Sequence, residues 1–78
     1  MIKPLSNIPN GAVVEVKEIL ASKLRVKLME MGLIDGKQIK VLFRAPLGDP
    51  IAVDLDGYVL ALRKEEAKLI QVESNEVE

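Results

Sequence analysis

Glycine and proline divide this chain into segments that fit short strands and one short helix. Glycines stand at both ends of the step from residue 32 to 36, prolines bracket a loop at residues 45–50, and an Asp-Gly dipeptide occupies positions 56–57. Proline fixes φ and lacks an amide donor, and glycine permits sharp chain reversals. The 78 residues therefore fit one small domain built from short elements.

A helix is predicted over residues 22–31. The apolar residues that recur on one face at helical spacing are Leu24, Leu28 and Met31. Ser22 can cap the first turn with its hydroxyl, and Gly32 stands where a left-handed residue commonly ends a helix. Leu33 can then fold back onto the last turn.

Five strands are predicted, over residues 12–20, 38–44, 51–55, 58–62 and 69–73. The alternation of the first strand slips at Glu18 and Ile19, which predicts a bulge or bend. Asp56 and Gly57 predict a two-residue type I′ hairpin between the third and fourth strands. Residues 64–68 suit a single helical turn.

In the second strand, alternation places Ile39, Val41 and Phe43 inside and leaves Leu42 outside. Hydrophobic residues make up 49% of the chain and aromatic residues 3%, so the core is expected to be aliphatic. An open sheet of this size cannot bury both faces, whereas a curled sheet encloses a core and removes most exposed edges. We therefore predict a mainly β fold, a small Src-homology-3-like β-barrel of about five strands with one helix and one short helical turn.

Composition excludes several classes of function. Histidine and cysteine are both absent, which removes the commonest metal ligands, the commonest general base, thiol chemistry and disulfides. The net charge of -1 gives no overall attraction to nucleic acid. The sequence shows neither a signal peptide pattern nor the ~20-residue apolar run of a membrane-spanning helix. We expect a non-enzymatic, cytoplasmic binding module with no cofactor, no nucleic-acid partner and no membrane insertion.

Two patterns superficially resemble ligand sites. Residues 32–38 lack both the spacing and the Ser or Thr of a phosphate loop. Residues 54–57 align with part of a calcium loop, but Ala52 and Arg63 would then stand at two ligand positions. A hairpin turn explains these residues better. Carboxylates alone bind Fe²⁺ weakly, so we assign no metal site.

Taken together, the motifs resemble those of the ferrous iron transport protein A (FeoA) family. In chain order they are the helix exit at 30–33, the glycine turn at 35–36, the loop at 45–50, the hairpin at 57–58 with residues 60–63, the turn at 65–67 and Ile70. The resemblance covers roughly residues 5–73. Residues 1–78 are accordingly expected to form a single FeoA-like domain, with residues 74–78 as a frayed tail.

The resemblance implies a Src-homology-3-like fold and an accessory role in ferrous iron uptake. In that role the domain binds and modulates the cytoplasmic part of the GTP-dependent iron permease FeoB. It also implies an association with transition metal ion binding, although these residues offer only carboxylates. The same fold occurs as the C-terminal domain of iron- and manganese-dependent repressors, so a metal-sensing regulatory domain is the alternative. A DNA-binding helix pair is missing from the sequence, which favours the accessory role.

The helix and the proline-bracketed loop are the candidate docking segments. Lys23 and Lys27 make the helix locally basic, and Met29, Leu42 and Leu47 are apolar at positions outside the predicted core. The candidate partner-binding residues are Lys23, Lys27, Met29, Met31, Leu33, Leu42, Pro46, Leu47 and Asp49. A solvated helix face and ordinary core packing stay open as alternative interpretations, as does weak homo-oligomerisation.

Overall fold

The computed structural model describes residues 1–74. Its elements are β1 (Ile2–Pro4), the 3-10 turn η1 (Leu5–Asn7), β2 (Val13–Ile19), α1 (Arg25–Glu30), β3 (Gln38–Arg44), β4 (Ile51–Leu55), β5 (Tyr58–Leu62), α2 (Lys64–Ala67) and β6 (Ile70–Ser74). Within these residues the strands form one antiparallel sheet in the order β1-β6-β2-β3-β4-β5. Residues 75–78, which belong to the tail that we expected to fray, lie outside the described residues.

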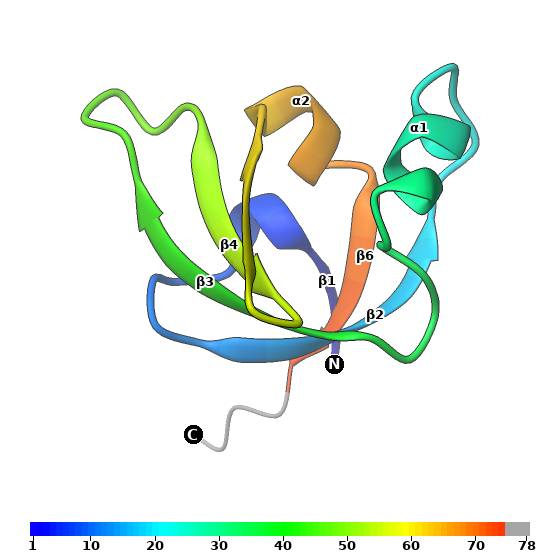
Figure 1. Cartoon of the computed structure of the whole chain (residues 1–78), viewed down its shortest axis with the longest axis horizontal. Coiled ribbons are helices and arrows are strands. Elements are labelled where there is room, and N and C mark those ends of the chain that lie inside the picture. The colour runs from blue at the N-terminus through cyan, green and yellow to red at the C-terminus, as the bar shows by residue number, and fades with distance from the viewer. Residues whose placement is uncertain (75–78) are drawn as a thin grey trace.

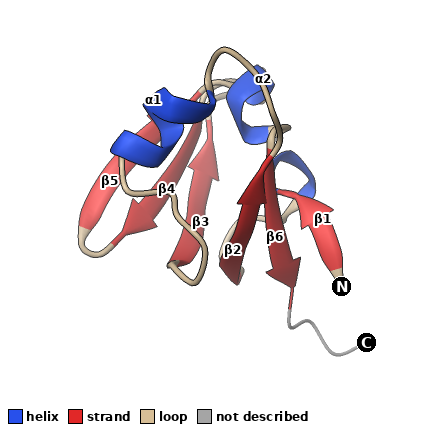
Figure 2. Ribbon diagram, turned by 90° about the vertical axis from the view of Figure 1, so that its right-hand side faces the viewer, coloured by secondary structure: helices blue, strands red, loops and turns tan. Residues whose placement is uncertain are grey.

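The sheet curls around the core, and both α-helices lie over its upper end (Figure 1). Seen from the side, β1 and β5 stand at opposite ends of the row of strands (Figure 2). In the described part of the chain these two strands do not pair with each other, so the sheet stays open. The mainly β prediction is confirmed, with six strands in place of five because β1 was not foreseen.

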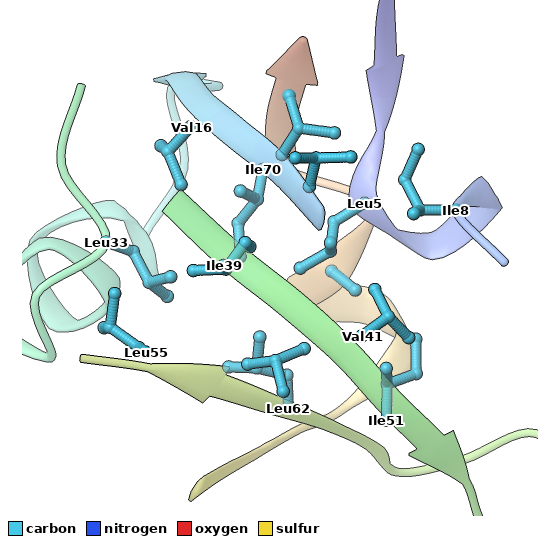
Figure 3. Packing of buried hydrophobic residues seen from close by; sticks show 14 of the residues in the cluster. Leu5, Ile8, Val16, Leu33, Ile39, Val41, Ile51, Leu55, Leu62 and Ile70 are labelled. Atoms are coloured by element: carbon cyan, nitrogen blue, oxygen red, sulfur yellow. The ribbon is translucent and has the colours of Figure 1, made fainter. Parts of the chain in front are cut away.

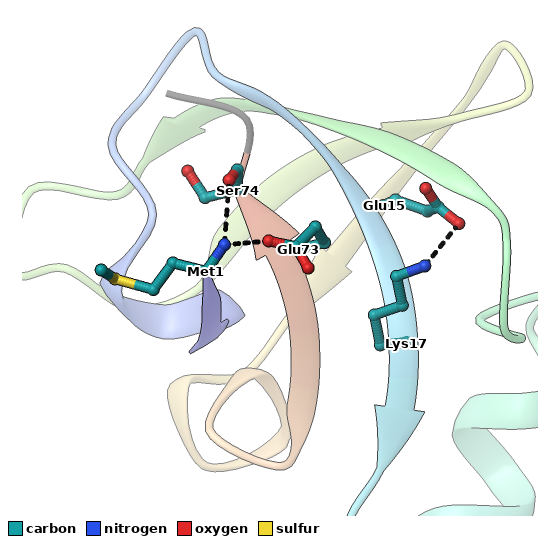
Figure 4. A network of polar contacts seen from close by, with 5 residues as sticks. All are labelled: Met1, Glu15, Lys17, Glu73 and Ser74. Carbon is teal, nitrogen blue, oxygen red and sulfur yellow. Dashed lines mark hydrogen bonds and ion pairs between the residues drawn. The ribbon is translucent and has the colours of Figure 1, made fainter. Parts of the chain in front are cut away.

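Strand β1 is formed by its antiparallel pairing with β6. The carbonyl of Met1 accepts a hydrogen bond from the Ser74 amide at 3.0 Å, and the Met1 amino group pairs with the Glu73 carboxylate (Figure 4). On the neighbouring strand β2, Lys17 Nζ lies 3.0 Å from Glu15 Oε2. A three-residue strand has no alternation that a sequence pattern can reveal. Ser74, expected in the tail, is instead the buried last residue of β6.

The core is aliphatic, as the composition predicts (Figure 3). Its buried residues are Leu5, Ile8, Val14, Val16, Ile19, Leu28, Leu33, Ile39, Val41, Ile51, Val53, Leu55, Leu62, Ala67, Ile70 and Val72. Most come from the strands and helices, and the others are Leu5 of η1, Ile8 directly after η1 and Leu33 in the turn after α1. Fully burying one Val, Leu or Ile side chain contributes about 1.5–3 kcal/mol, so these residues supply the main stabilisation of the domain.

Arg44 fixes the segment around η1 against β3. Its guanidinium donates hydrogen bonds to the carbonyls of Ser6 at 3.1 Å and Ile8 at 2.6 Å, and to Asn10 Oδ1 at 2.6 Å. Bonds from a charged donor are stronger than neutral ones. This side chain therefore holds Ile8 in place over one end of the core.

Helix α1 is shorter at its start than predicted. It begins at Arg25 rather than Ser22. The Ser22 hydroxyl accepts a hydrogen bond from the Leu24 amide at 3.1 Å, and the Ser22 carbonyl accepts one from Arg25 at 3.3 Å. Ser22 therefore forms a turn ahead of the helix, because hydroxyl side chains readily bond to the backbone two residues on.

The end of α1 agrees with the prediction. The Leu33 amide donates to the Leu28 carbonyl at 3.2 Å, and the Gly32 amide donates to the Met29 carbonyl at 3.0 Å. This pair of bonds is a Schellman motif, which needs a left-handed residue at Gly32, where φ is 101°. A Cβ on Gly32 would also lie 3.1 Å from Leu55 Cδ2. The chain can leave the helix this way only because residue 32 is glycine.

Two bulges change which side chains face the core. The bulge between Val16 and Glu18, opposite β6, agrees with the slip expected near Glu18 and Ile19. A second bulge, between Val41 and Phe43 opposite β4, was not predicted. An added residue reverses the alternation beyond it. Phe43 is therefore 58% exposed rather than buried, which corrects its assignment to the core.

The hairpin between β4 and β5 forms as predicted. Asp56 and Gly57 both have positive φ, 53° and 88°, and Leu55 pairs directly with Tyr58. The Gly57 amide donates to Asp54 Oδ1 at 2.9 Å, and Lys37 Nζ lies 2.6 Å from Asp56 Oδ2. The two aspartates thus have structural roles in the turn.

Glu66 joins the two helices. Its carboxylate accepts a hydrogen bond from the Arg63 amide at 2.9 Å through Oε1, and Lys27 Nζ of α1 lies 3.0 Å from Oε2. The Arg63 amide lowers the pKa of Glu66; burial acts in the opposite direction, and Lys27 lowers the pKa further. The charged carboxylate is therefore the form that stabilises the packing of α2 against α1.

Replacing Gly32 with Ala should destabilise the domain by about 1–2 kcal/mol from the left-handed backbone alone, with an added cost from the Leu55 contact. Gly48→Ala is the matched control, because Gly48 has φ 86° and no atom within 4 Å of an added Cβ. Urea denaturation should show a larger loss for Gly32→Ala. Equal losses would mean that the contact with Leu55 does not matter.

Glu66 should make the domain acid-sensitive. A carboxyl whose pKa is lowered by folding adds stability that is fully present above its ordinary pKa of 4.5 and is lost as the pH falls through the folded pKa. Glu66→Gln should lower the free energy of unfolding by about 1 kcal/mol at pH ~7, and the gap should narrow at pH ~3. Glu65→Gln, at an exposed neighbour, is the control. A gap that does not depend on pH would contradict this role.

Candidate partner-binding surface

The two predicted docking segments lie at the same end of the molecule. The loop between β3 and β4 and helix α1 both project from the upper end, with α2 between them (Figure 1). We call this end, represented by Val26, Met29, Ile34, Pro46 and Leu47, the helix-loop surface. Its apolar members are exposed to solvent. The topology therefore places both segments at one end of the molecule, on either side of α2.

The β3–β4 loop presents Leu47 to solvent. The Gly48 amide donates to the Ala45 carbonyl at 2.7 Å and the Ala45 amide donates to the Pro50 carbonyl at 3.0 Å, so the loop is closed on itself. Leu47, at its tip, is 95% exposed. An apolar side chain held this far into water by an ordered turn suits contact with another molecule.

Asp49 connects the loop to the helices. Its Oδ1 accepts a hydrogen bond from the Lys64 amide at 3.1 Å, at the first residue of α2. Since Glu66 in turn contacts Lys27, a chain of polar contacts runs from the loop through α2 to α1. The relative position of Leu47 and α1 is set by these contacts.

Helix α1 contributes a cleft and an apolar face. The cleft, about 180 Å³, lies between α1 and β2, and its lining residues are Val16, Lys17, Glu18, Ile19, Arg25, Met29, Leu33, Ile34 and Asp35. The charged side chains around it carry both signs, and the rest of the lining is apolar. Such a cleft can accept an apolar side chain of a partner.

The structure separates the candidate residues into exposed and covered ones. Lys23, Lys27, Met29, Pro46, Leu47 and Asp49 are exposed, while Met31 and Leu42 are half-buried. Leu33 is 0% exposed and belongs to the core, because the Schellman turn folds it under α1. We therefore leave Leu33 out of the proposed surface.

Sequence reasoning did not identify Val26 and Ile34 as members of this surface. Val26 is 65% exposed and lies three residues before Met29, hence on the same side of the helix. Its position off the stripe of Leu24, Leu28 and Met31 was the available signal. The exposure of Ile34 depends on how the chain leaves α1, which only the folded structure shows.

The described residues were also compared with the requirements of a metal site and of a membrane span, and they form a second cleft. Residues 1–74 contain no group of three or more His, Cys, Asp or Glu side chains placed to hold a metal ion. None of their helices has the length and apolar character needed to cross a bilayer. A second cleft, about 280 Å³, lies near the hairpin turn, and its lining residues are Val13, Gln38, Ile39, Lys40, Asp54, Asp56 and Gly57.

Known structures with the same fold include several FeoA proteins. The FeoA-like protein from Clostridium acetobutylicum is 42% identical, with a TM-score of 0.92 over 99% of this chain and 91% of that one. The FeoA of Stenotrophomonas maltophilia complexed with zinc, described as an SH3 domain protein, is 26% identical, with a TM-score of 0.79 over 94% and 89% of the two chains. The predicted Src-homology-3-like fold is confirmed.

A manganese-dependent transcriptional repressor also superposes, with a TM-score of 0.84 over 94% of this chain and 41% of the repressor. Its identity is 21%, so this likeness concerns the fold alone.

Sequence comparison identifies the family. An Fe(2+) transport protein A/Fe(2+) transporter FeoB fusion protein of Porphyromonas gingivalis is 43% identical over 49 residues, which are 63% of this chain and 6% of that much longer protein. The family described as the FeoA domain matches residues 3–74. Because this match includes the helix exit, the proline-bracketed loop and strands β2 to β6, the chain belongs to the FeoA domain family.

Proposed function

We propose that this chain is a non-enzymatic accessory of ferrous iron uptake, which binds the cytoplasmic part of FeoB through the helix-loop surface. The observation that carries the proposal is the fusion protein, in which a related segment and the transporter share one polypeptide. Covalent linkage keeps two modules at high effective concentration. Where the two modules are separate chains, a binding surface on one must hold the other nearby.

The helix-loop surface has the physical character of a docking site. Leu47, Met29 and Val26 expose apolar area, and covering apolar area at the centre of an interface favours binding. The contacts of Asp49 and Glu66 hold this surface in place before binding. An interface that is already ordered loses less entropy when a partner binds.

The domain would act on transport by favouring one conformation of FeoB. A bound protein shifts a conformational equilibrium only to the extent that it binds one state more tightly than the other. No chemical step on this chain is required. The repressor-like alternative has only the shared fold behind it, since Asp54 accepts from the Gly57 amide and Asp56 pairs with Lys37.

Leu47→Glu and Met29→Glu should each weaken binding to the purified cytoplasmic part of FeoB by at least about tenfold, which corresponds to about 1.4 kcal/mol. Each change places a charge in an interface that must exclude water. Isothermal titration calorimetry gives the dissociation constants, and circular dichroism confirms that the variants stay folded. Uptake of radiolabelled ferrous iron by cells that express each variant should fall in the same order.

Val13→Glu is the matched control. Val13 is an exposed apolar residue that lines the cleft near the hairpin turn, away from the helix-loop surface. Its replacement should leave the affinity for FeoB unchanged. Wild-type affinity in both Leu47→Glu and Met29→Glu would disprove the assignment of this surface, and no binding by the wild-type chain would disprove the proposed partner.

A further inference from the structure

The two edges of the sheet differ in how well they are protected. Strand β1 is short and carries Lys3 and Pro4, both of which discourage further strand pairing. Strand β5 has neither a charged residue nor a proline among its five residues. It also lies at the opposite end of the row of strands from β1 (Figure 2). A strand with these properties is an available template for another strand.

The register of the hairpin shows which backbone groups point to the open side of β5. A two-residue hairpin starts from a hydrogen-bonded pair, here Leu55 with Tyr58. Hydrogen-bonded and non-hydrogen-bonded pairs then alternate along the strands. The amides and carbonyls of Leu60 and Leu62 are therefore directed toward β4, and those of Val59 and Ala61 toward the open side.

We infer that β5 pairs with β5 of a second copy of this chain, antiparallel and with Leu60 on the two-fold axis. This register places Val59 of each copy opposite Ala61 of the other. The two residues are then hydrogen-bonded pairs on both sides of the axis, so all four backbone groups directed outward on each strand gain partners. A shift by one residue would place groups that already face β4 against the second copy.

Apolar side chains support the same register. On the outer face of the sheet, Phe43 pairs with Ala52, and Ala52 pairs with Ala61. Val59 stands on that face too and is 65% exposed. The row from Phe43 to Ala61 would continue across the edge onto Val59 of the second copy. Association would therefore cover apolar side chains that the single domain leaves in water.

The register of β5 favours a second copy as the occupant. Around an axis at Leu60, Val59 and Ala61 of one copy meet Ala61 and Val59 of the other, so the same two residues satisfy both strands. The charged neighbours lie outside the pair, since Asp56 is in the hairpin turn and Lys64 begins α2. The strand is thus complementary to itself in backbone and apolar groups.

Val59→Lys should abolish this association, since lysine on an edge strand opposes pairing. In sedimentation velocity runs at rising concentration, the weight-average sedimentation coefficient should increase for the wild type and stay constant for Val59→Lys. Leu47→Glu changes an exposed apolar residue outside β5 and should behave as the wild type. Thermal unfolding followed by circular dichroism checks that each variant is folded.

Hydrogen exchange on the wild type tests the strand without any substitution. The amides of Val59 and Ala61 should exchange more slowly as the protein concentration rises, while the Leu60 amide, already paired with β4, should not change.

A wild-type chain that stays monomeric at every concentration would overturn the inference, as would association of Val59→Lys equal to that of the wild type. Exchange at Val59 and Ala61 that does not depend on concentration would also overturn it. These results are independent of binding to FeoB, because that proposal depends on Leu47 and Met29 and would stand or fail without them.

Discussion

The interior of this domain is built from aliphatic side chains, and its stability depends on enclosing them with a single curled sheet. The sequence holds one Phe and one Tyr, and both lie on the surface. Cysteine is absent, so no disulfide can compensate for a small core. The ends of the curled sheet need separate cover. Leu5 and Ile8 cover one end, and Leu28 and Leu33 from the α1 region cover another part of the core.

The polar contacts have a different task, which is to fix the position of the exposed segments. Asp49 joins the β3–β4 loop to α2, and Glu66 joins α2 to α1. Gly32 lets the chain turn sharply under α1 without a steric clash with Leu55. As a result, Leu47 and Met29 project from a defined framework. Order of this kind favours specific recognition, since little flexibility is left for a partner to remove.

The helix-loop surface and the open edge of β5 are different parts of the molecule. One consists of side chains on a helix and a loop, and the other consists mainly of backbone groups on a strand. Recognition by side chains depends on shape and apolar contact, whereas edge pairing depends on register. A small domain with both could bind a transporter and a second copy of itself through separate contacts.

Short sequence patterns predicted several turns, the end of the helix and the aliphatic core of this protein. Gly32 at the helix exit, the Asp56-Gly57 turn, the proline-bracketed loop and the aliphatic core were all predictable, because each depends on the dihedral preferences or polarity of neighbouring residues. The position of Leu47 outside the core was predictable for the same reason.

Tertiary structure alone decided the rest. Strand β1 exists because β6 pairs with it, and Phe43 faces outward because β3 bulges opposite β4. Val26 and Ile34 join the surface through the way α1 packs on the sheet. Strand pairing, bulge position and helix packing depend on contacts between residues far apart in the chain. A pattern read along neighbouring residues does not contain that information.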